Sequence, residues 1–267
     1  MRALLLAAGL GTRLRPLTNF LPKCLVPIHG RPLLDYWLET LVNGGVSEIL
    51  INTHYYSSMV VEFIKRSEWA PRLELVHEER LLGTGGTILK NRTFFKNEPF
   101  LVAHADNLTI FDIPTFLNHH TNRPSYTELT MMIFESPEPQ SCGIVELDEQ
   151  GVVVKFHEKV PSPPSNLANA AVYLIEPSVV DMMANLGNED IDLSTEVIPH
   201  LLGKILTYRN NCYHRDIGTH SSWVMANIDF PIMPATRQNA KAWEGVISMG
   251  DRYLERNIEK LLASAKI

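Results

Sequence analysis

The chain has 267 residues, of which 45% are hydrophobic and 20% are charged, the balance of a globular protein with a substantial core. Its formal net charge is −6 and it has no apolar run long enough to cross a bilayer, so we expect neither nucleic acid nor a membrane among its partners. The three cysteines are odd in number and widely spaced, which excludes a disulfide framework or a cysteine metal cluster and favours a reducing, cytoplasmic setting.

A short apolar strand followed by a glycine-rich loop begins the chain. Residues 3–8 are all apolar, and such a run bounded by glycine is typical of a buried central strand in an α/β sheet. Gly9 and Gly11 allow a sharp turn and let backbone N–H groups approach an anion. Positive charge follows on the same side, from Arg13, Arg15 and Lys23. The segment therefore predicts a polyphosphate site.

The spacing of these glycines excludes two common phosphate-binding motifs. A dinucleotide fingerprint would need a third glycine at Leu14, and the P-loop pattern does not occur. The stretch instead resembles the signature of the sugar-1-phosphate nucleotidylyltransferases, an apolar strand followed by Gly-x-Gly-Thr-Arg-Leu-x-Pro-Leu-Thr and later by Pro-Lys and an apolar-Pro pair. The matching residues are Gly9, Gly11, Thr12, Arg13, Leu14, Pro16, Leu17, Thr18, Pro22, Lys23, Leu25 and Pro27.

Strands and helices alternate through the next part of the chain. Apolar spacing predicts a helix over 31–42, and short apolar runs predict strands at 48–52 and 73–77. A second helix, over 57–66, is expected to begin after a serine cap. This order predicts a parallel sheet with right-handed crossovers. The resemblance implies a Rossmann-like, mixed but mainly parallel α/β sheet flanked by helices, of the GT-A-like type, with a small antiparallel acceptor-binding subdomain.

A second glycine-rich loop is expected at residues 81–87, ahead of a helix that runs to about Asn91. The resemblance implies that Gly83, Thr84 and Gly85 lie beside the nucleobase. The alternative is a tight turn that caps the helix. The segment is similar to Leu-Gly-Thr-Ala-Gly or Leu-Gly-Thr-Gly-Gly of guanylyltransferases that act on mannose or heptose 1-phosphates. Members that use dTTP or UTP with glucose carry Gln-Pro and Gly-Leu-Ala there.

Asp106 follows a predicted buried strand at 100–103, where α/β sheets bind their ligands. A lone aspartate after a strand is also a common turn former or helix cap. The resemblance implies that Asp106 is the first of two metal-binding aspartates. The second is Asp216, in the stretch Asp216-Ile217-Gly218-Thr219, which matches the family pattern Asp-x-Gly-Thr.

A hairpin is predicted after a helix at 113–120 and a strand at 129–134. Its strands, 142–147 and 152–157, flank a polar turn, and their antiparallel pairing indicates a small subdomain over the edge of the sheet. The hairpin carries Gly143 at one end and Glu158-Lys159 at the other. An exposed Glu-Lys pair is ordinarily of little consequence. The resemblance implies that Glu158 holds sugar hydroxyls and that Lys159 holds the sugar phosphate.

Further along the chain, a strand is predicted at 169–174 and helices at 178–186 and 220–228. The resemblance implies that Asn169 meets the sugar, in a segment where this chain has Ala171 and many members have glycine. Glu196 is either a sugar-hydroxyl ligand or the fourth residue of a capping box that begins a helix.

The helical stripe in residues 240–267 predicts either packing on the core or a contact in a homo-oligomer. Residues 1–228 are expected to form the catalytic domain, with 1–134 mainly binding the nucleotide and 135–228 mainly binding the sugar phosphate. Residues 229–267 form the remaining helical tail.

The resemblance implies an EC 2.7.7-type enzyme that joins a nucleoside triphosphate to a sugar 1-phosphate, with Mg²⁺ as cofactor, and GTP with a mannose- or heptose-type acceptor is favoured. The implied catalytic residues are Arg13, Lys23, Asp106, Lys159 and Asp216. The implied nucleotide contacts are Leu6, Ala8, Gly9, Gly11, Thr12, Arg13, Lys23, Gly83, Thr84 and Gly85. The implied acceptor contacts are Gly143, Glu158, Lys159, Asn169 and Glu196.

Several alternatives stay open. A member that uses UTP, dTTP or CTP with glucose, an amino sugar or a non-sugar phosphate has the same general site. A non-catalytic regulator that binds nucleotide sugars would be expected to have lost a metal aspartate or an active-site lysine. A glycosyltransferase would be expected to carry Asp-x-Asp, whereas this chain has His104-Ala105-Asp106-Asn107.

Overall fold

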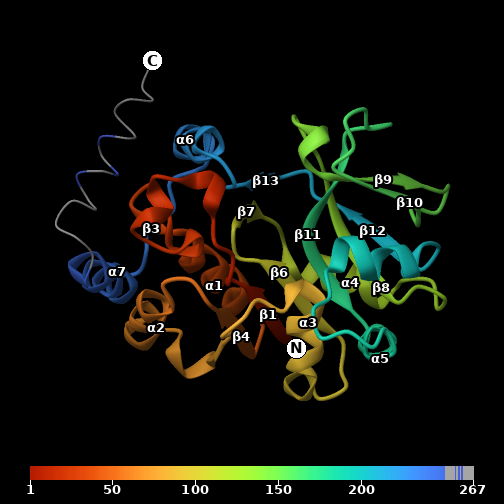
Figure 1. Ribbon diagram of the computed structural model, residues 1–267, viewed down its shortest axis with the longest axis horizontal. Helices are drawn as coiled ribbons and strands as arrows, with labels where there is room; N and C mark the ends of the chain where they lie inside the picture. Colours follow the sequence, from red (N-terminus) through yellow and green to blue (C-terminus); the bar gives the residue numbers. More distant parts are fainter. Residues whose placement is uncertain (250–255, 257, 259, 261–267) are drawn as a thin grey trace.

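The computed structural model describes residues 1–249 together with residues 256, 258 and 260. A nine-stranded sheet runs through the molecule, with the strand order β10-β9-β11-β6-β1-β4-β5 and with β8 and β12 joined to it through β11 (Figure 1). Its parallel part comprises β1 (Arg2–Leu6), β4 (Glu48–Thr53), β5 (Leu73–His77) and β6 (Phe100–His104). The predicted parallel sheet is therefore confirmed.

The second half of the chain adds antiparallel strands to the same sheet. The long strand β11 (Leu167–Ile175) pairs antiparallel with β6, β8 (Leu129–Glu135) and β9 (Gly143–Leu147). The predicted hairpin is formed by β9 and β10 (Val153–Glu158), and β12 (Ile205–Arg209) lies parallel to β8. The hairpin thus continues the main sheet at its edge.

Helices cover both faces of the sheet. The first face carries α1 (Leu33–Asn43), α2 (Ser57–Arg66) and α4 (Ile113–Thr121), whose apolar side chains share one core layer with alternate residues of β1. The other face carries α3 (Gly83–Lys90) and α5 (Pro177–Ala184), which pack in a second layer. The predicted serine cap of α2 is wrong, because the helix follows Tyr56, whose left-handed backbone (φ 48°) turns the chain into it.

Two small sheets stand apart from the main one. The first joins β2 (Pro27–Ile28) to β3 (Arg31–Pro32). In the second, β7 (Asn107–Ile110) pairs with β13 (Tyr213–Asp216), so that Asp216 lies opposite Asn107. The Ile217 amide also donates to the Asp106 carbonyl at 3.1 Å. These contacts bring segments about a hundred residues apart to one end of the sheet.

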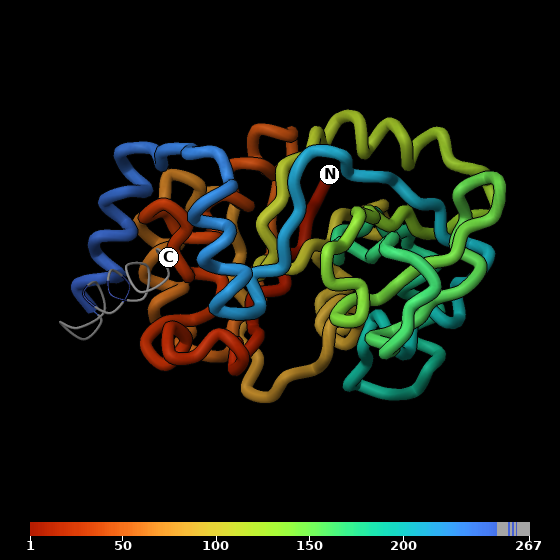
Figure 2. The backbone as a smooth tube through the Cα atoms, turned by 90° about the horizontal axis from the view of Figure 1, so that it is seen from above, coloured from red at the N-terminus to blue at the C-terminus, as the bar shows by residue number. Residues whose placement is uncertain are grey.

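The last described helices return to the N-terminal half. Figure 2 shows α6 (His220–Asp229) and α7 (Arg237–Met249) beside the first part of the chain, while the green and cyan segments form the other side. Ala242, Trp243 and Val246 of α7 are buried in the first core layer. These three residues pack on the core, whereas Tyr253, Leu254 and Leu261 lie outside the described residues. Within the described part of the chain, no helix is long and apolar enough to cross a membrane.

Candidate functional site

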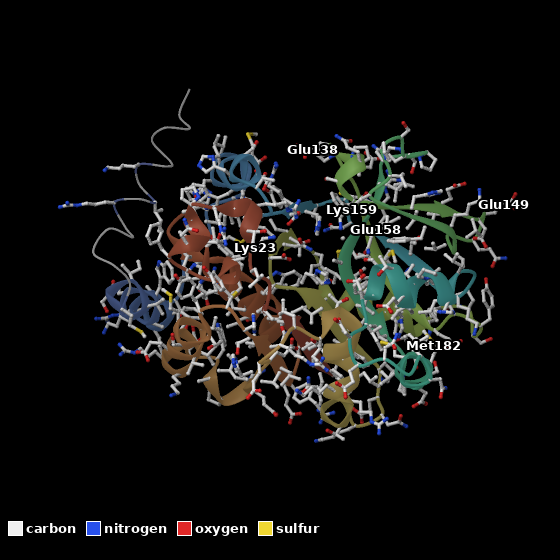
Figure 3. The ribbon with its side chains drawn as sticks, in the orientation of Figure 1. Lys23, Glu138, Glu149, Glu158, Lys159 and Met182 are labelled. Carbon is white, nitrogen blue, oxygen red and sulfur yellow. The ribbon has the colours of Figure 1, made fainter. Side chains whose placement is uncertain are left out.

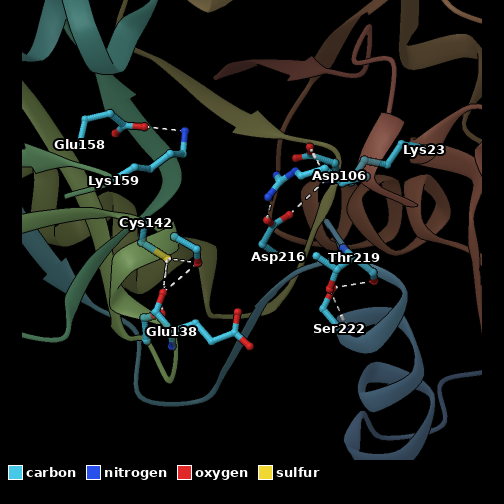
Figure 4. A network of polar contacts seen from close by, with 12 residues as sticks. Lys23, Asp106, Glu138, Cys142, Glu158, Lys159, Asp216, Thr219 and Ser222 are labelled. Carbon is cyan, nitrogen blue, oxygen red and sulfur yellow. Dashed lines mark hydrogen bonds and ion pairs between the residues drawn. The ribbon is translucent and has the colours of Figure 1, made fainter. Parts of the chain in front are cut away.

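Lys23, Asp106 and Asp216 form a compact charged cluster at one end of the sheet (Figure 4). The Lys23 Nζ atom donates to an Asp106 carboxylate oxygen at 2.7 Å and to an Asp216 carboxylate oxygen at 3.2 Å. Asp106 follows the last residues of β6, and Asp216 ends β13. The structure therefore brings together the two aspartates and the lysine, three side chains that are distant in sequence.

Charges in this cluster stabilise one another. Burial opposes the charge of Lys23, but the Asp106 and Asp216 carboxylates outweigh it, and the pKa of Lys23 lies above its ordinary value. Burial likewise favours the neutral form of Asp106, yet the Lys23 ammonium holds the pKa of that carboxyl below its usual range. Two carboxylates and one ammonium thus leave the cluster with one net negative charge.

The donor set of the cluster fits a hard divalent cation. The position of Lys23 Nζ shows that both carboxylates converge on a single positive group. Mg²⁺ prefers oxygen ligands and is commonly held by one or two carboxylates together with substrate phosphates and water. No group of three potential metal-ligating side chains is found among the described residues. Asp106 and Asp216 would therefore hold such an ion with oxygens from substrate and solvent.

The first glycine loop lies against this cluster. Gly11 has φ 61°, and a Cβ atom there would lie 2.8 Å from the Thr18 Cγ2 atom and 3.1 Å from the Lys23 Cβ atom. Nothing lies within 4 Å of the corresponding point at Gly9, so that residue faces open space. The Arg13 guanidinium is 63% exposed and lies 3.9 Å from Asp216. Of the other expected nucleotide contacts, Thr12 is exposed, Leu6 is half-buried and Ala8 is buried.

A buried polar network that the sequence reasoning missed supports this loop. The Asn52 side-chain oxygen accepts from the Ala7 amide at 2.7 Å, and its Nδ2 donates to Glu78 Oε1 at 3.0 Å. Thr87 Oγ1 also donates to Glu78 Oε1, at 2.6 Å. Asn52 and Glu78 are almost completely buried, whereas Glu79 is exposed. The signal for Asn52 was a lone polar residue at the end of the otherwise apolar run Ile49–Ile51.

The second glycine segment is the first turn of helix α3, so the expected open loop ahead of the helix is wrong. The Gly85 and Gly86 amides donate to the Ile191 carbonyl at 2.8 and 3.1 Å. A Cβ at Gly83 would lie 2.4 Å from that carbonyl oxygen, and one at Gly86 would lie 2.3 Å from the Glu189 carbonyl oxygen. Close packing against residues 189–191 therefore accounts for these glycines. Thr84 Oγ1 accepts from the Leu193 amide at 2.7 Å.

Glu158 and Lys159 lie on the other half of the molecule, at the end of β10 (Figure 3). Their side chains form an ion pair of 2.6 Å, and the Lys159 side chain is 62% exposed. Figure 4 shows the Glu158–Lys159 pair on one segment of the chain and the cluster of Lys23, Asp106 and Asp216 on others. A Cβ at Gly143 would lie 2.3 Å from Phe156 Cζ and 2.8 Å from Glu158 Oε2, so the glycine makes room for the Glu158 carboxylate.

The remaining acceptor-side residues make internal contacts. The Asn169 side chain donates to the Tyr173 hydroxyl at 2.7 Å and accepts from the Ala171 amide at 2.9 Å. Ala171 has φ 52°, and the register of β11 with β8 shifts at this point. Glu196 accepts from the Asp192 amide at 2.8 Å, and Asp192 in turn caps the turn Leu193–Val197. Asp192 is therefore the N-cap residue of this turn, and Glu196 supports the cap by accepting from the Asp192 amide.

His104 precedes Asp106 on the end of β6. Burial lowers the pKa of its imidazole and Asp106 only partly offsets this effect, so the ring is neutral at pH 7. Its Nε2 atom is buried and has no hydrogen-bond partner in the described part of the chain. Asn107, in contrast, has a structural role, because its side chain donates to the Ala170 carbonyl at 3.0 Å.

Comparisons with known proteins show which family the chain resembles. A family model described as nucleotidyl transferase matches residues 2–231. Mannose-1-phosphate guanylyltransferase of Mycobacterium tuberculosis is 33% identical over 232 residues, which cover 85% of this chain and 64% of that protein. The bifunctional protein GlmU of Methanocaldococcus jannaschii is 28% identical over 262 residues, 96% of this chain and 60% of that protein. The chain thus spans about three fifths of the length of these two relatives.

Solved structures share the fold. A putative glucose-1-phosphate thymidylyltransferase from Bacillus anthracis has a TM-score of 0.81 at 21% identity, over 90% of this chain and 98% of that chain. HddC from Yersinia pseudotuberculosis, complexed with GMP-PN, has a TM-score of 0.73 at 22% identity, over 86% of this chain and 99% of that chain. With the family model matched over most of its length, the chain belongs to the nucleotidyl transferase family.

Proposed function

We propose that this protein transfers a nucleotidyl group from a nucleoside triphosphate to a sugar 1-phosphate and releases pyrophosphate. The observation that carries the proposal is the convergence of Lys23, Asp106 and Asp216 beside the first glycine loop. The loop, with Arg13, would hold the triphosphate. Lys159, on the other half of the molecule, would hold the acceptor phosphate.

The reaction needs positioned charge more than it needs a general base. An oxygen of the acceptor phosphate, already an anion at neutral pH, forms a bond to the α-phosphorus of the triphosphate. The bond from that phosphorus to the oxygen bridging to the β-phosphate breaks, and pyrophosphate leaves with the electron pair. Two anions must approach each other, so fixed positive charge and orientation would supply most of the rate. Lys23 and Arg13 would stabilise the triphosphate charge in this arrangement.

Asp106 and Asp216 would hold the divalent ion, with Mg²⁺ as the expected metal. When bound, such an ion supplies Lewis-acid stabilisation of phosphate oxygens. The two aspartates would fix the ion at this end of the sheet. The pairing of β7 with β13 keeps their backbones together, and the absence of a Cβ at Gly218 leaves room for the Asp216 carboxylate.

We further propose that GTP is the preferred triphosphate, with a mannose- or heptose-type acceptor. The curated relatives include mannose-1-phosphate guanylyltransferases, among them the Mycobacterium tuberculosis protein. The buried Glu78 carboxylate is engaged by Asn52, Thr87 and the Leu82 amide, so the support for guanine comes from these relatives. UTP, dTTP or CTP with another acceptor is the alternative.

The test is a pyrophosphate-release assay with four triphosphates, each combined with a panel of sugar 1-phosphates. Release with at least one pair supports the proposal. A regulator would bind nucleotide without releasing pyrophosphate, and a glycosyltransferase would consume a nucleotide sugar without releasing pyrophosphate. Either result would overturn the proposed activity.

A further inference from the structure

The point where the chain leaves strand β1 is held by a side chain of the neighbouring strand. Leu6 of β1 lies opposite Asn52 of β4, and the Asn52 Oδ1 atom accepts from the Ala7 amide at 2.7 Å. On the other side of β1, the Leu6 carbonyl accepts from the Ala105 amide at 3.0 Å. The first glycine loop follows directly. The Asn52 side chain therefore fixes the direction in which this loop leaves the sheet.

The other end of the Asn52 side chain reaches the second glycine segment. Its Nδ2 atom donates to Glu78 Oε1 at 3.0 Å and to Thr87 Oγ1 at 3.3 Å. Glu78 Oε2 accepts from the Leu82 amide at 3.4 Å. The Thr87 hydroxyl also lies 3.0 Å from the Gly83 carbonyl, at the first residue of α3. A single side chain thus connects the first glycine loop with the start of α3.

The network is buried and holds a carboxylate. Asn52, Glu78 and Thr87 are only 3%, 1% and 1% exposed. Within the described part of the chain, Glu78 accepts from neutral donors alone, namely Asn52, Thr87 and the Leu82 amide. Burial of a polar group is costly unless the group is hydrogen-bonded. Loss of the Asn52 side chain would leave the Ala7 amide and the Glu78 carboxylate without their shared partner, so both segments would shift.

The hydrogen bonds of this network run in one direction. A backbone amide can only donate, so the Asn52 oxygen faces Ala7 and the Asn52 nitrogen faces Glu78. In the double variant Asn52→Asp/Glu78→Gln, the carboxylate at position 52 accepts from the Ala7 amide and from the new amide at position 78. The oxygen of that new amide still accepts from the Leu82 amide. The Thr87 hydroxyl can donate or accept, so it fits either arrangement.

We propose that Asn52 is a positioning residue that holds the first glycine loop and the start of α3 in the geometry that binds the nucleoside triphosphate, an inference that rests on the proposed function. Asn52 acts through the Ala7 amide and the Glu78 carboxylate and not by contact with the substrate. The network joins β1, β4 and α3, whereas Lys159 and Asn169, assigned to the acceptor, follow β10 and lie on β11. The triphosphate KM therefore depends on Asn52 far more than the acceptor KM does.

The experiment compares the wild-type protein with Asn52→Ala, Asn52→Asp, Glu78→Gln and the double variant. The control is Asn239→Ala, which removes an equally buried asparagine from the contact of α7 with Asp35. Pyrophosphate release is measured with the triphosphate that the wild type uses best, and triphosphate and sugar 1-phosphate are varied separately. Calorimetry of the same triphosphate with the free protein gives a readout independent of turnover. Urea titrations give the free energy of unfolding of each variant.

We expect Asn52→Ala to raise the triphosphate KM about tenfold and to leave the acceptor KM within about twofold. Asn52→Asp should raise the triphosphate KM at least as much, because it turns a second buried carboxylate toward Glu78. Since the double variant restores every donor–acceptor pair, its triphosphate KM should lie within about threefold of the wild type. Asn239→Ala should lower the free energy of unfolding and leave both KM values within about twofold.

Several results would overturn the role of Asn52. They are an Asn52→Ala variant that keeps the triphosphate KM or raises both KM values equally, and an Asn239→Ala variant whose triphosphate KM rises as much. A double variant that fails to fold, or in which the penalties of the single changes add, overturns it as well. If both single variants at position 52 fail to fold, the double variant decides.

Failure of the inference is distinguishable from failure of the proposed function. A wild-type protein that releases no pyrophosphate with any pair of substrates refutes the proposed function, and the inference with it. An active wild-type protein that gives any of the contrary results above refutes the role of Asn52 alone.

Discussion

At the residue scale, the aspartate pair is the feature on which the proposed activity depends most directly. Asp106→Asn and Asp216→Asn should each lower turnover by roughly a hundredfold or more, because each removes a negative charge that would hold the metal ion. Turnover at saturating Mg²⁺ measures this effect, with circular dichroism to check folding. Asp112→Asn is the control, since Asp112 caps α4 at the surface and asparagine caps helices equally well. Unchanged turnover in either site variant would remove that aspartate from the site.

Ala171 is a second residue with a measurable consequence. Its left-handed backbone, φ 52°, is accessible to glycine at no steric cost but costs an alanine about 1 kcal/mol. Ala171→Gly should therefore raise the free energy of unfolding by about 0.5–1 kcal/mol in urea denaturation. The neighbouring Ala170 is fully buried in the strand, and Ala170→Gly should lower it. Destabilisation by both variants would contradict the strain assigned to Ala171.

At the element scale, the hairpin of β9 and β10 carries the groups assigned to the acceptor. Lys159 is exposed and pairs only with Glu158 among the described residues. Lys159→Ala should raise the KM for the sugar 1-phosphate, because it removes the cation that would meet the acceptor phosphate. Calorimetry of triphosphate binding to the free protein should show no comparable loss. Loss of triphosphate binding in this variant would place Lys159 in the other half of the site.

The docking of helix α7 depends on a buried side chain, Asn239. It donates to Asp35 at 2.6 Å and accepts from the Ser67 hydroxyl and the Glu68 amide at 3.0 Å. Asn239→Ala would leave these buried groups unpaired and should lower the free energy of unfolding by about 2–4 kcal/mol. The adjacent Gln238 is exposed, so Gln238→Ala should change it by less than about 0.5 kcal/mol in the same urea titration. Equal effects of the two variants would argue against this network.

Local pattern predicted most elements but not the contacts between them. The strand at 73–77 and the hairpin at β9 and β10 were predictable because apolar runs and turn residues lie side by side in sequence. Gly83 to Gly86 give the local signal of a loop, and their close fit against residues 189–191 depends on contacts that only the fold provides. The bulge at Ala171 has no local signal, since alanine ordinarily favours regular structure. The pairing of Asp106 with Asp216 was implied by family resemblance, whereas the contacts of Lys23 with both carboxylates were not predicted and needed the fold.

At the scale of the whole molecule, the prediction concerns which nucleoside triphosphate the assembled site prefers. We predict a higher kcat/KM for GTP than for UTP or dTTP with the right acceptor. A site that accepts from two guanine donors leaves an acceptor unpaired with uracil, at a cost of about 1–3 kcal/mol, or roughly tenfold or more in specificity. Competition assays with paired triphosphates measure this ratio. Equal or better use of UTP or dTTP would refute the guanine assignment and leave nucleotidyl transfer intact.

The position of Lys23 also has a consequence for how the protein would acquire its metal. Its ammonium lies between the two carboxylates and offsets one of their two charges, so their mutual repulsion is already reduced before any ion binds. A metal ion that binds the two carboxylates would then have to displace the Lys23 ammonium. A divalent ion offers two charges for the one that it replaces, whereas a monovalent ion offers no electrostatic gain. Lys23 would thereby act as an internal competitor that biases the aspartates toward divalent ions, and its release would free a positive charge for the incoming triphosphate.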